Sequence, residues 1–378
     1  MGVGYKLFAR PALALQDSER AHKRSLRMLR WMAATAPGRL MLRSLYAPRR
    51  TVPVNLFGHE YKHPFGLAAG MDKNAEALRG WDAIGLAFIE IGGVTMLGQE
   101  GNPKPRMFRA DASKALVNRM GFNNQGSEAI QRHLEAHVRR YGRPKAPLWV
   151  NLGKSKVTSL EDAHTDYATT MERLWKHTDV FVINVSSPNT PHLRTLQNDE
   201  GLQRILDACH EVNQRLSAST TKDEIPLLVK IAPDVADEQL ELIVRTAQAN
   251  GAAGMVVSNT TLARPEPRSS KEKHLFEEQG GLSGQPLKNR STELIRQVRS
   301  LAGPDWPIVG VGGVANADDA WEKIRAGASL VQAYSAFVFE GPALVKSVVH
   351  GLDKRRRSAG FETLQQAVGM DDVPAEDC

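Results

Sequence analysis

The sequence predicts an α/β protein, a (β/α)8 TIM barrel with an N-terminal helical module in front of it. Eight short apolar runs recur between residues 65 and 333, and amphipathic helical patterns separate most of them. This alternation of strand and helix is typical of a parallel barrel. The charge is uneven, because the basic excess lies in the first 50 residues. We therefore divide the chain into a basic helical extension, residues 1–50, and a barrel, residues 51–378.

The overall composition is that of a soluble globular protein, with 42% hydrophobic and 24% charged residues. No apolar run approaches the roughly 18 residues that a membrane-spanning helix needs. Cys209 and Cys378 are far apart and lack the spacing of metal ligands, so we expect a reducing compartment and no structural zinc. The strand ends carry no histidine pair or carboxylate cluster, so no metal site is expected.

The N-terminal module is predicted to lie on a membrane surface. Residues 1–50 contain eleven lysines and arginines and two acidic residues, a net charge of +9 in a chain whose total is +7. On a helical wheel, residues 20–33 place five basic side chains on one arc and an apolar face on another, as interfacial helices do. Pro37 and Gly38 end this helix, and residues 40–46 form a second one. The alternative is a helical hairpin packed on the barrel with solvated arginines. Nucleic acid is disfavoured, because an apolar face suits lipid better.

The barrel elements follow in order after a hairpin expected at residues 52–62. The strands are expected at residues 65–69, 88–91, 148–152, 180–185, 227–231, 254–257, 308–311 and 330–333. The helices are expected at residues 124–141, 161–176, 199–217, 236–249, 288–300 and 316–325. A doubly wound open sheet is the alternative. It usually carries a Gly-x-Gly-x-x-Gly turn after its first strand, and Gly66 and Gly70 do not form one.

Polar residues gather where the predicted strands end, which is where barrel enzymes bind their ligands. The fourth strand runs into Ser187, Pro188 and Asn189, and Pro188 removes a backbone donor and stops the ladder. The alternative for this stretch is a simple turn. Lys230 in the fifth strand leaves a Schiff-base aldolase open as a second enzyme class.

Glycines near the seventh and eighth strands indicate a phosphate-bearing ligand. They stand at positions 281, 284, 312 and 313, near Ser335 in the strand-end set. Barrels commonly hold phosphate with backbone N–H groups at this place. Together, the strand ends favour a cofactor with a phosphate and a small polar substrate.

The motifs of the chain, in order, resemble those of dihydroorotate dehydrogenases, and specifically the membrane-associated, quinone-using class 2. They are GLAAGMDK at 66–73, GNPKPR at 101–106, NRMGFNN at 118–124, VNLGK at 150–154, NVSSPNT at 184–190, VKIAP at 229–233, SNTT at 258–261, GGLSG at 280–284, GVGG at 310–313 and LVQAYS at 330–335. The resemblance covers nearly the whole chain. It implies oxidation of (S)-dihydroorotate to orotate in de novo pyrimidine (UMP) biosynthesis.

The resemblance also implies an FMN cofactor and assigns residues to it and to the substrate. FMN would be bound by Ala69, Gly70, Asn151, Asn184, Lys230, Ser258, Gly284, Gly313, Tyr334 and Ser335. The substrate would be bound by Lys73, Asn118, Phe122, Asn184, Asn189, Asn259 and Thr260. A cation suits the substrate carboxylate, and asparagine amides suit its ring amide and imide edges.

By the same resemblance, Ser187 is the catalytic base, taking a proton from C5 while hydride leaves C6 for the flavin. A hydroxyl needs a relay for this task, and Thr190 or an ordered water would serve. Lys230 would stabilise the negative charge of the reduced flavin. The soluble class uses a cysteine as base, and neither Cys209 nor Cys378 suits a strand-end loop.

A membrane quinone would reach the flavin along a passage bordered by His22, Arg109 and Tyr334. The family resemblance and the basic extension together predict a monomeric peripheral protein on the cytoplasmic face of the cell membrane, attached to its anionic surface. An inactive membrane-recruited barrel is a further alternative. The chain departs from the family pattern at Gly93, where Thr or Ser is usual, and at Met120, which replaces a frequent tyrosine.

Overall fold

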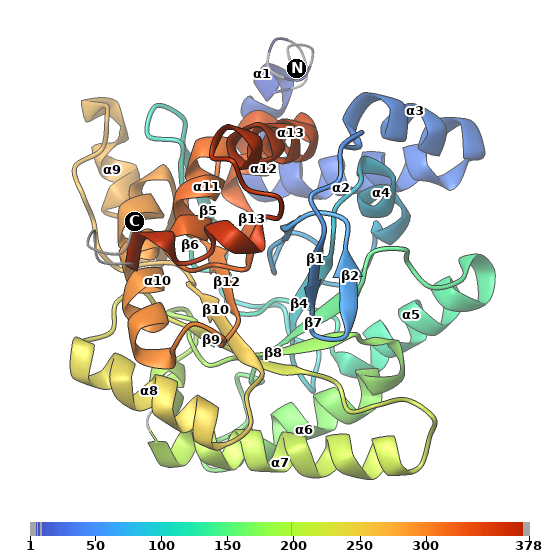
Figure 1. Ribbon diagram of the computed structural model, residues 1–378, viewed down its shortest axis with the longest axis vertical. Coiled ribbons are helices and arrows are strands. Elements are labelled where there is room, and N and C mark those ends of the chain that lie inside the picture. Colours follow the sequence, from blue (N-terminus) through green and yellow to red (C-terminus); the bar gives the residue numbers. More distant parts are fainter. Residues whose placement is uncertain (1–4, 6, 8–9, 198, 373–378) are drawn as a thin grey trace.

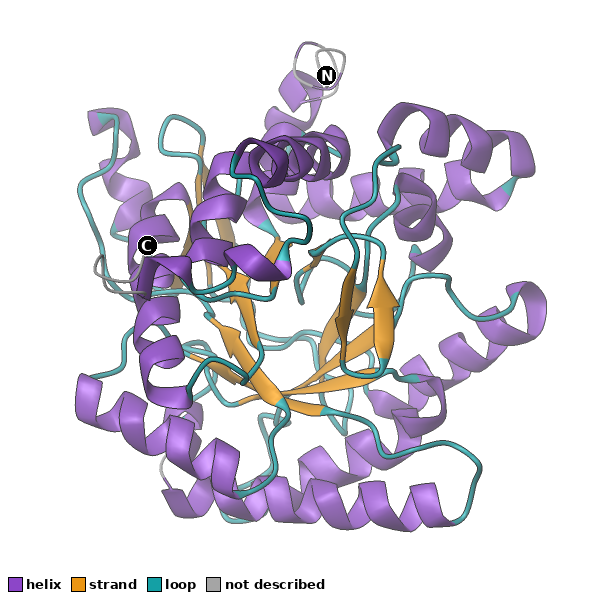
Figure 2. Cartoon of the chain, viewed as in Figure 1, coloured by secondary structure: helices purple, strands orange, loops and turns teal. Residues whose placement is uncertain are grey.

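Eight parallel strands close into a barrel at the centre of the molecule, with helices around it (Figures 1 and 2). The computed structural model describes residues 5, 7, 10–197 and 199–372; Cys378 lies outside them. The barrel strands are β3 (Phe65–Leu67), β4 (Ile89–Val94), β7 (Leu148–Leu152), β8 (Val180–Asn184), β9 (Leu227–Ile231), β10 (Gly254–Val257), β12 (Ile308–Val311) and β13 (Leu330–Ala333). All eight predicted strands are confirmed, and the open sheet is excluded.

The helices that cover the barrel include the six that were predicted, within three residues at each end, and four that were not predicted. They are α4 (Leu78–Ile84), α5 (Ser127–Tyr141), α6 (Ala163–Leu174), α7 (Asp199–Ala218), α8 (Asp237–Ala249), α10 (Lys288–Ala302), α11 (Ala317–Arg325), α12 (Ser335–Glu340) and α13 (Ala343–Ser358), with a short α9 (Lys273–Phe276). Every residue of the barrel strands is buried, because helices cover their outer faces. This explains why the strands read as continuous apolar runs.

The predicted hairpin packs under the amino-terminal end of the barrel. Its strands, β1 (Val54–Leu56) and β2 (His59–Tyr61), are joined by Phe57 and Gly58, both with positive φ, as a two-residue hairpin turn requires. Tyr61 lies edge-on to Phe88, which stacks on Trp149 with ring centroids 4.3 Å apart. This aromatic cluster packs at the start of β4 and β7 and leaves the other end for ligands.

A three-stranded antiparallel sheet, absent from the sequence prediction, lies over the carboxyl-terminal end of the barrel. It consists of β5 (Met107–Ala110), β6 (Ala115–Asn118) and β11 (Gly281–Gly284), in the order β11-β6-β5. These strands come from two long connections, one after β4 and one after β10. We call this sheet the roof, because it brings Asn118 and Gly284 over the strand ends.

The N-terminal segment forms three helices, α1 (Arg10–Ala14), α2 (Ser18–Ala34) and α3 (Ala36–Tyr46). Asp17 caps α2 by accepting from two backbone N–H groups at 3.1 Å. The break between the two helices was predicted at Pro37 and Gly38, but it lies at Thr35. Thr35 caps the second helix, and Pro37 lies in its first turn, where its missing N–H costs nothing. Among the described residues, no helix is long and apolar enough to cross a membrane.

The helices α2 and α3 pack on the barrel with one side and leave apolar side chains exposed on the other. Leu26, Ala33 and Leu42 belong to the main hydrophobic core. Trp31, Leu40 and Leu45 are 76%, 69% and 51% exposed. One face of this segment is therefore packed on the barrel, as the helical-hairpin alternative predicts, and contact of the other face with a membrane stays a prediction.

Candidate active site

One pocket opens at the carboxyl-terminal end of the barrel, between the strand ends and the roof. It encloses about 1180 Å³ of empty space, solvent at its mouth included. Its lining joins residues that follow the barrel strands with residues of the roof, so both contribute to one site.

The structure brings nearly all the sequence-predicted site residues to this pocket. They are Ala69, Gly70, Lys73, Asn118, Phe122, Asn184, Ser187, Asn189, Lys230, Ser258, Asn259, Thr260, Gly284, Gly313, Tyr334 and Ser335. Asn151, His22 and Arg109 are not part of the lining. Asn151 is fully buried behind it. Its side-chain oxygen accepts from Asn184 at 2.9 Å, so it orients a lining residue.

A buried carboxylate that sequence reasoning missed organises the floor of the pocket. Glu90 in β4 is fully buried and accepts hydrogen bonds from Asn151 at 2.7 Å and from Gln332 at 2.5 Å. The Lys230 ammonium lies 3.9 Å from the same carboxylate. A buried charge is tolerated only with such partners. The sequence does contain a sign of this role, because Glu90 is a charged residue inside an apolar run.

The floor also contains an unpaired acceptor. The side-chain oxygen of Gln332 has no hydrogen-bond partner among the described residues, although Gln332 lines the pocket. Buried polar groups normally have partners, so this oxygen calls for a donor from a ligand. An imide or amide N–H of a bound ring would satisfy it.

Lys73 stands at the pocket wall next to the roof and donates a hydrogen bond to Asn123. Burial, with a smaller contribution from the nearby Arg106 charge, lowers the pKa of Lys73 to about 7. A carboxylate bound beside this ammonium would favour the charged form. Lys73 is thus suited to bind an anionic substrate group.

Ser187 follows β8 and lies in the lining with only a small exposed fraction. Its hydroxyl oxygen accepts the Asn189 backbone N–H at 3.2 Å, which leaves the hydroxyl hydrogen for another partner. Asn189 in turn donates to the Asn118 carbonyl of the roof at 3.1 Å. Proton-accepting and substrate-binding candidates therefore share one loop.

The glycine-rich part of the pocket is formed by Gly284, Gly312 and Gly313, all with positive φ. A Cβ at Gly313 would lie 2.9 Å or less from Lys288 backbone atoms. Ser335 exchanges a 2.7 Å hydrogen bond with Ser283 of the roof. Gly93, the departure from the family pattern, also lines the pocket, and a Cβ there would collide with the Phe122 ring at 2.6 Å.

Of the three residues predicted to border the quinone passage, Tyr334 lines the pocket, whereas His22 lies in α2, outside the lining. Burial, opposed in part by the Glu19 charge and reinforced by the Lys73 charge, lowers the pKa of His22 to about 4. Burial raises the pKa of Tyr334 to about 12, with the Glu19 carboxylate adding to it. Both side chains are therefore uncharged at neutral pH. Arg109 lies in β5 and pairs with Asp111 at 3.3 Å.

Fold and pocket together define a barrel enzyme whose active site lies at the carboxyl ends of its strands. The family model for dihydroorotate dehydrogenase matches residues 51–355. The chain is 44% identical to dihydroorotate dehydrogenase (quinone) of Streptomyces avermitilis, over 97% of this chain and 98% of that protein. It is 45% identical to dihydroorotate dehydrogenase (quinone) of Gloeobacter violaceus, with the same coverage.

Solved structures agree with the sequence matches. Dihydroorotate dehydrogenase of Eimeria tenella in complex with ferulenol superposes with a TM-score of 0.85 at 35% identity, over 95% of this chain and 96% of that chain. The chain belongs to the dihydroorotate dehydrogenase family, within its quinone-dependent class 2. This family is flavin-dependent.

The cysteine argument made from the sequence also holds where it can be examined. Cys209 lies in α7 and is fully buried, and burial raises the pKa of its thiol to about 12. A buried, protonated thiol is inert. The Schiff-base alternative is likewise disfavoured, because Lys230 lies beside a carboxylate and not in the apolar or cationic surroundings that activate such lysines.

Proposed function

We propose that the protein oxidises (S)-dihydroorotate to orotate in de novo pyrimidine (UMP) biosynthesis and passes the electrons through FMN to a membrane quinone. The observation that carries this proposal is the single pocket in which the serine, lysine and asparagine candidates meet a glycine-rich cradle. Relatives that match over the whole chain are named for the same reaction.

The pocket fits FMN in two respects. Its glycine-rich end suits a phosphate, and the Gln332 side-chain oxygen, which has no partner among the described residues, suits a ring N–H. When bound, FMN supplies the acceptor for the hydride that leaves the substrate. Lys230 would offset negative charge that develops at the pocket floor during the reaction, and Glu90 holds that ammonium in place.

The chain's own residues then perform the remaining tasks. Lys73 would bind the substrate carboxylate, and the amides of Asn118, Asn189 and Asn259 would fix the ring. Ser187 would take the proton from C5 while its own hydroxyl proton passes to a relay, Thr190 or an ordered water. Its loop contacts the roof through the hydrogen bond from Asn189 to the Asn118 carbonyl.

The N-terminal helices would supply membrane contact and quinone access. Trp31, Leu40 and Leu45 point away from the barrel, and arginines flank them. Such a surface would insert its apolar side chains into the interface while the arginines contact anionic lipid, at about 1 kcal/mol each. We place the protein as a monomer on the cytoplasmic face of the cell membrane, where anionic lipid faces the cell interior.

The lowered pKa of Lys73 gives a pH dependence of ligand binding. In the free enzyme Lys73 loses its proton as the pH rises through about 7. Binding of a carboxylate requires the ammonium, so above pH 7 each binding event takes up a proton. We expect the Kd of orotate to rise up to tenfold per pH unit between pH 7 and 9. Titration of the flavin absorbance with orotate measures this. A Kd that is constant from pH 6 to 9 would exclude the role of Lys73.

The reaction itself is tested by mixing the flavin-loaded protein with dihydroorotate in the absence of oxygen. Loss of the visible flavin absorbance, with one orotate formed per flavin, is expected. An aldolase would carry no flavin and would be trapped on Lys230 by borohydride with its carbonyl substrate. An inactive barrel would keep its absorbance unchanged.

A further inference from the structure

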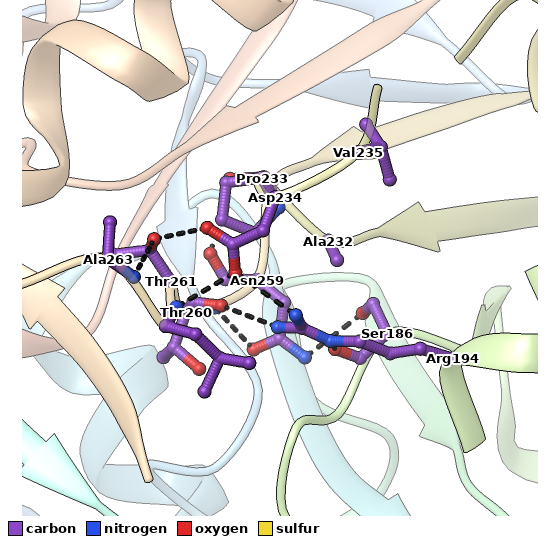
Figure 3. A network of polar contacts seen from close by, with 12 residues as sticks. Ser186, Arg194, Ala232, Pro233, Asp234, Val235, Asn259, Thr260, Thr261 and Ala263 are labelled. Carbon is purple, nitrogen blue, oxygen red and sulfur yellow. Dashed lines mark hydrogen bonds and ion pairs between the residues drawn. The ribbon is translucent and has the colours of Figure 1, made fainter. Parts of the chain in front are cut away.

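The loop that carries Ser187 is tied to two neighbouring barrel loops by one side chain, Arg194. This side chain belongs to the short 3-10 helix Leu193–Gln197, at the far end of the loop from β8. Figure 3 shows its guanidinium group between Ser186, Asp234 and Thr260. No sequence motif singled out this residue.

Arg194 makes three contacts in three directions. Its Nε donates to the Ser186 carbonyl at 3.2 Å, and Nη2 donates to the Thr260 carbonyl at 3.1 Å. Its Nη1 lies 3.0 Å from a carboxylate oxygen of Asp234. The planar guanidinium suits this work, because its donors point in fixed directions. A lysine could not reach all three acceptors with one fixed geometry.

The Ser186 carbonyl directly precedes the proton-accepting candidate, and the Thr260 carbonyl belongs to a substrate-binding candidate. Ser186 is directly followed by Ser187, and its hydroxyl accepts from Asn259 at 3.0 Å. Thr260 is a substrate candidate that follows Asn259 in the loop after β10. The guanidinium therefore holds the backbone of the Ser187 loop in a fixed position relative to the backbone of the loop after β10.

Asp234, after β9, anchors the guanidinium. Its carboxylate accepts the Leu262 backbone N–H at 2.8 Å and the Thr261 hydroxyl hydrogen. Arg194 and Asp234 are each only about one-quarter exposed, at 22% and 24%. Gln197 adds a second tie between the same loops, since its side-chain oxygen accepts from the Ala232 N–H at 3.1 Å.

We propose that Arg194, held by Asp234, is a positioning residue that locks the Ser187 loop closed over the pocket. The proposal rests on the function proposed above. A misplacement of about 1 Å at a reacting group can cost a hundredfold in rate, so a device that fixes two loops together has a large effect without touching the substrate. Its loss would leave the tip of the loop held mainly by neutral hydrogen bonds, such as that from Asn189 to the roof.

The experiment compares Arg194→Met with a matched control at the other end of the barrel. Arg143 makes the same kinds of contact there, with the Lys176 and His177 carbonyls and with Asp179. Both variants lose a guanidinium that joins two carbonyls and a carboxylate. The two readouts are the limiting rate of flavin reduction by dihydroorotate and the hydrogen exchange of residues 185–197.

We expect Arg194→Met to lower the limiting rate at least tenfold and to speed exchange in the loop, with flavin content unchanged. Arg194→Lys keeps the charge beside Asp234 and should recover part of the rate. Arg143→Met should keep the rate within twofold of the parent and leave the loop exchange as it was. If Arg194→Met does not fold, Asp234→Asn tests the same lock and should show the same two changes in smaller measure.

Two results would overturn the inference. The first is a parent-like rate and parent-like loop exchange in Arg194→Met. The second is an equal loss in Arg143→Met, since the loss would then follow general destabilisation. Failure of the proposed function would look different, because the parent protein itself would then not reduce its flavin with dihydroorotate, while loop exchange would still report on the lock.

Discussion

Replacing Ser187 with alanine is expected to leave the flavin bound and to slow its reduction by dihydroorotate about a thousandfold at neutral pH. A positioned proton acceptor contributes roughly 10²–10⁴ in rate. Ser187 lines the pocket where β8 ends, and its hydroxyl hydrogen is free to be passed on. Rapid mixing without oxygen measures the reduction directly, because quinone and membrane take no part in it.

The adjacent serine is the matched control for this variant. Ser186 is fully buried, and its hydroxyl donates to the Asn184 side chain at 2.8 Å and accepts from Asn259. We expect Ser186→Ala to lose about tenfold through misplacement of these amides, much less than Ser187→Ala. Equal losses in the two variants would mean that the loop, and not the Ser187 hydroxyl, carries the effect.

A second large effect is expected when Trp31, Leu40 and Leu45 are all replaced by glutamine. Full burial of a large apolar side chain is worth roughly 1.5–3 kcal/mol, so even partial insertion of three of them predicts about a hundredfold loss of vesicle affinity. Turnover with a long-chain quinone in anionic vesicles should fall with it. Reduction of a soluble dye should stay as in the parent. Sedimentation with vesicles and the two acceptor assays measure these outcomes.

Substitution is a sharper test than deletion of the extension. Leu26, Ala33 and Leu42 lie in the common core, so removing the helices would expose it. The control replaces Leu160, Leu242 and Leu301, three exposed leucines elsewhere on the molecule, with glutamine. Unchanged vesicle binding and quinone turnover in the Trp31, Leu40 and Leu45 variant would refute the membrane role of these helices.

The barrel could be predicted from the sequence because each strand is buried on both faces and therefore appears as a short apolar run. The roof was not predicted, since β5 and β11 have neither a long apolar run nor a regular alternation, and β6 has only the three apolar residues 115–117. Gly281 and Gly284, for example, occupy strand positions where most sequences place large side chains. The structure fixes these positions by pairing with β6.

The site residues likewise fall into those that the sequence predicts and those that it does not. Lys73, Ser187 and Asn259 follow predicted strands, and their meeting at one pocket follows from the closed barrel. Arg194 lies seven residues beyond Ser187 in the same loop. The residues around it in the sequence give no sign that Asp234 is its partner. The contact exists only because the loops after β8, β9 and β10 are adjacent around the barrel.

The helical wheel of the N-terminal segment was right about amphipathicity and incomplete about orientation. It placed Met28 and Leu29 on one apolar face. In the structure Leu29 packs on Gly80 of α4, whereas Met28 is exposed. A wheel shows which side of a helix is apolar. It does not show where the protein contact ends and the free surface begins.

One pocket is expected to join dihydroorotate oxidation to quinone reduction. The most direct measurement records flavin absorbance in the vesicle-bound protein without oxygen, first after dihydroorotate and then after a long-chain quinone. We expect bleaching with one orotate per flavin, followed by full recovery of the absorbance with one quinol per flavin. Absorbance that dihydroorotate leaves unchanged, or that quinone does not restore, would contradict it.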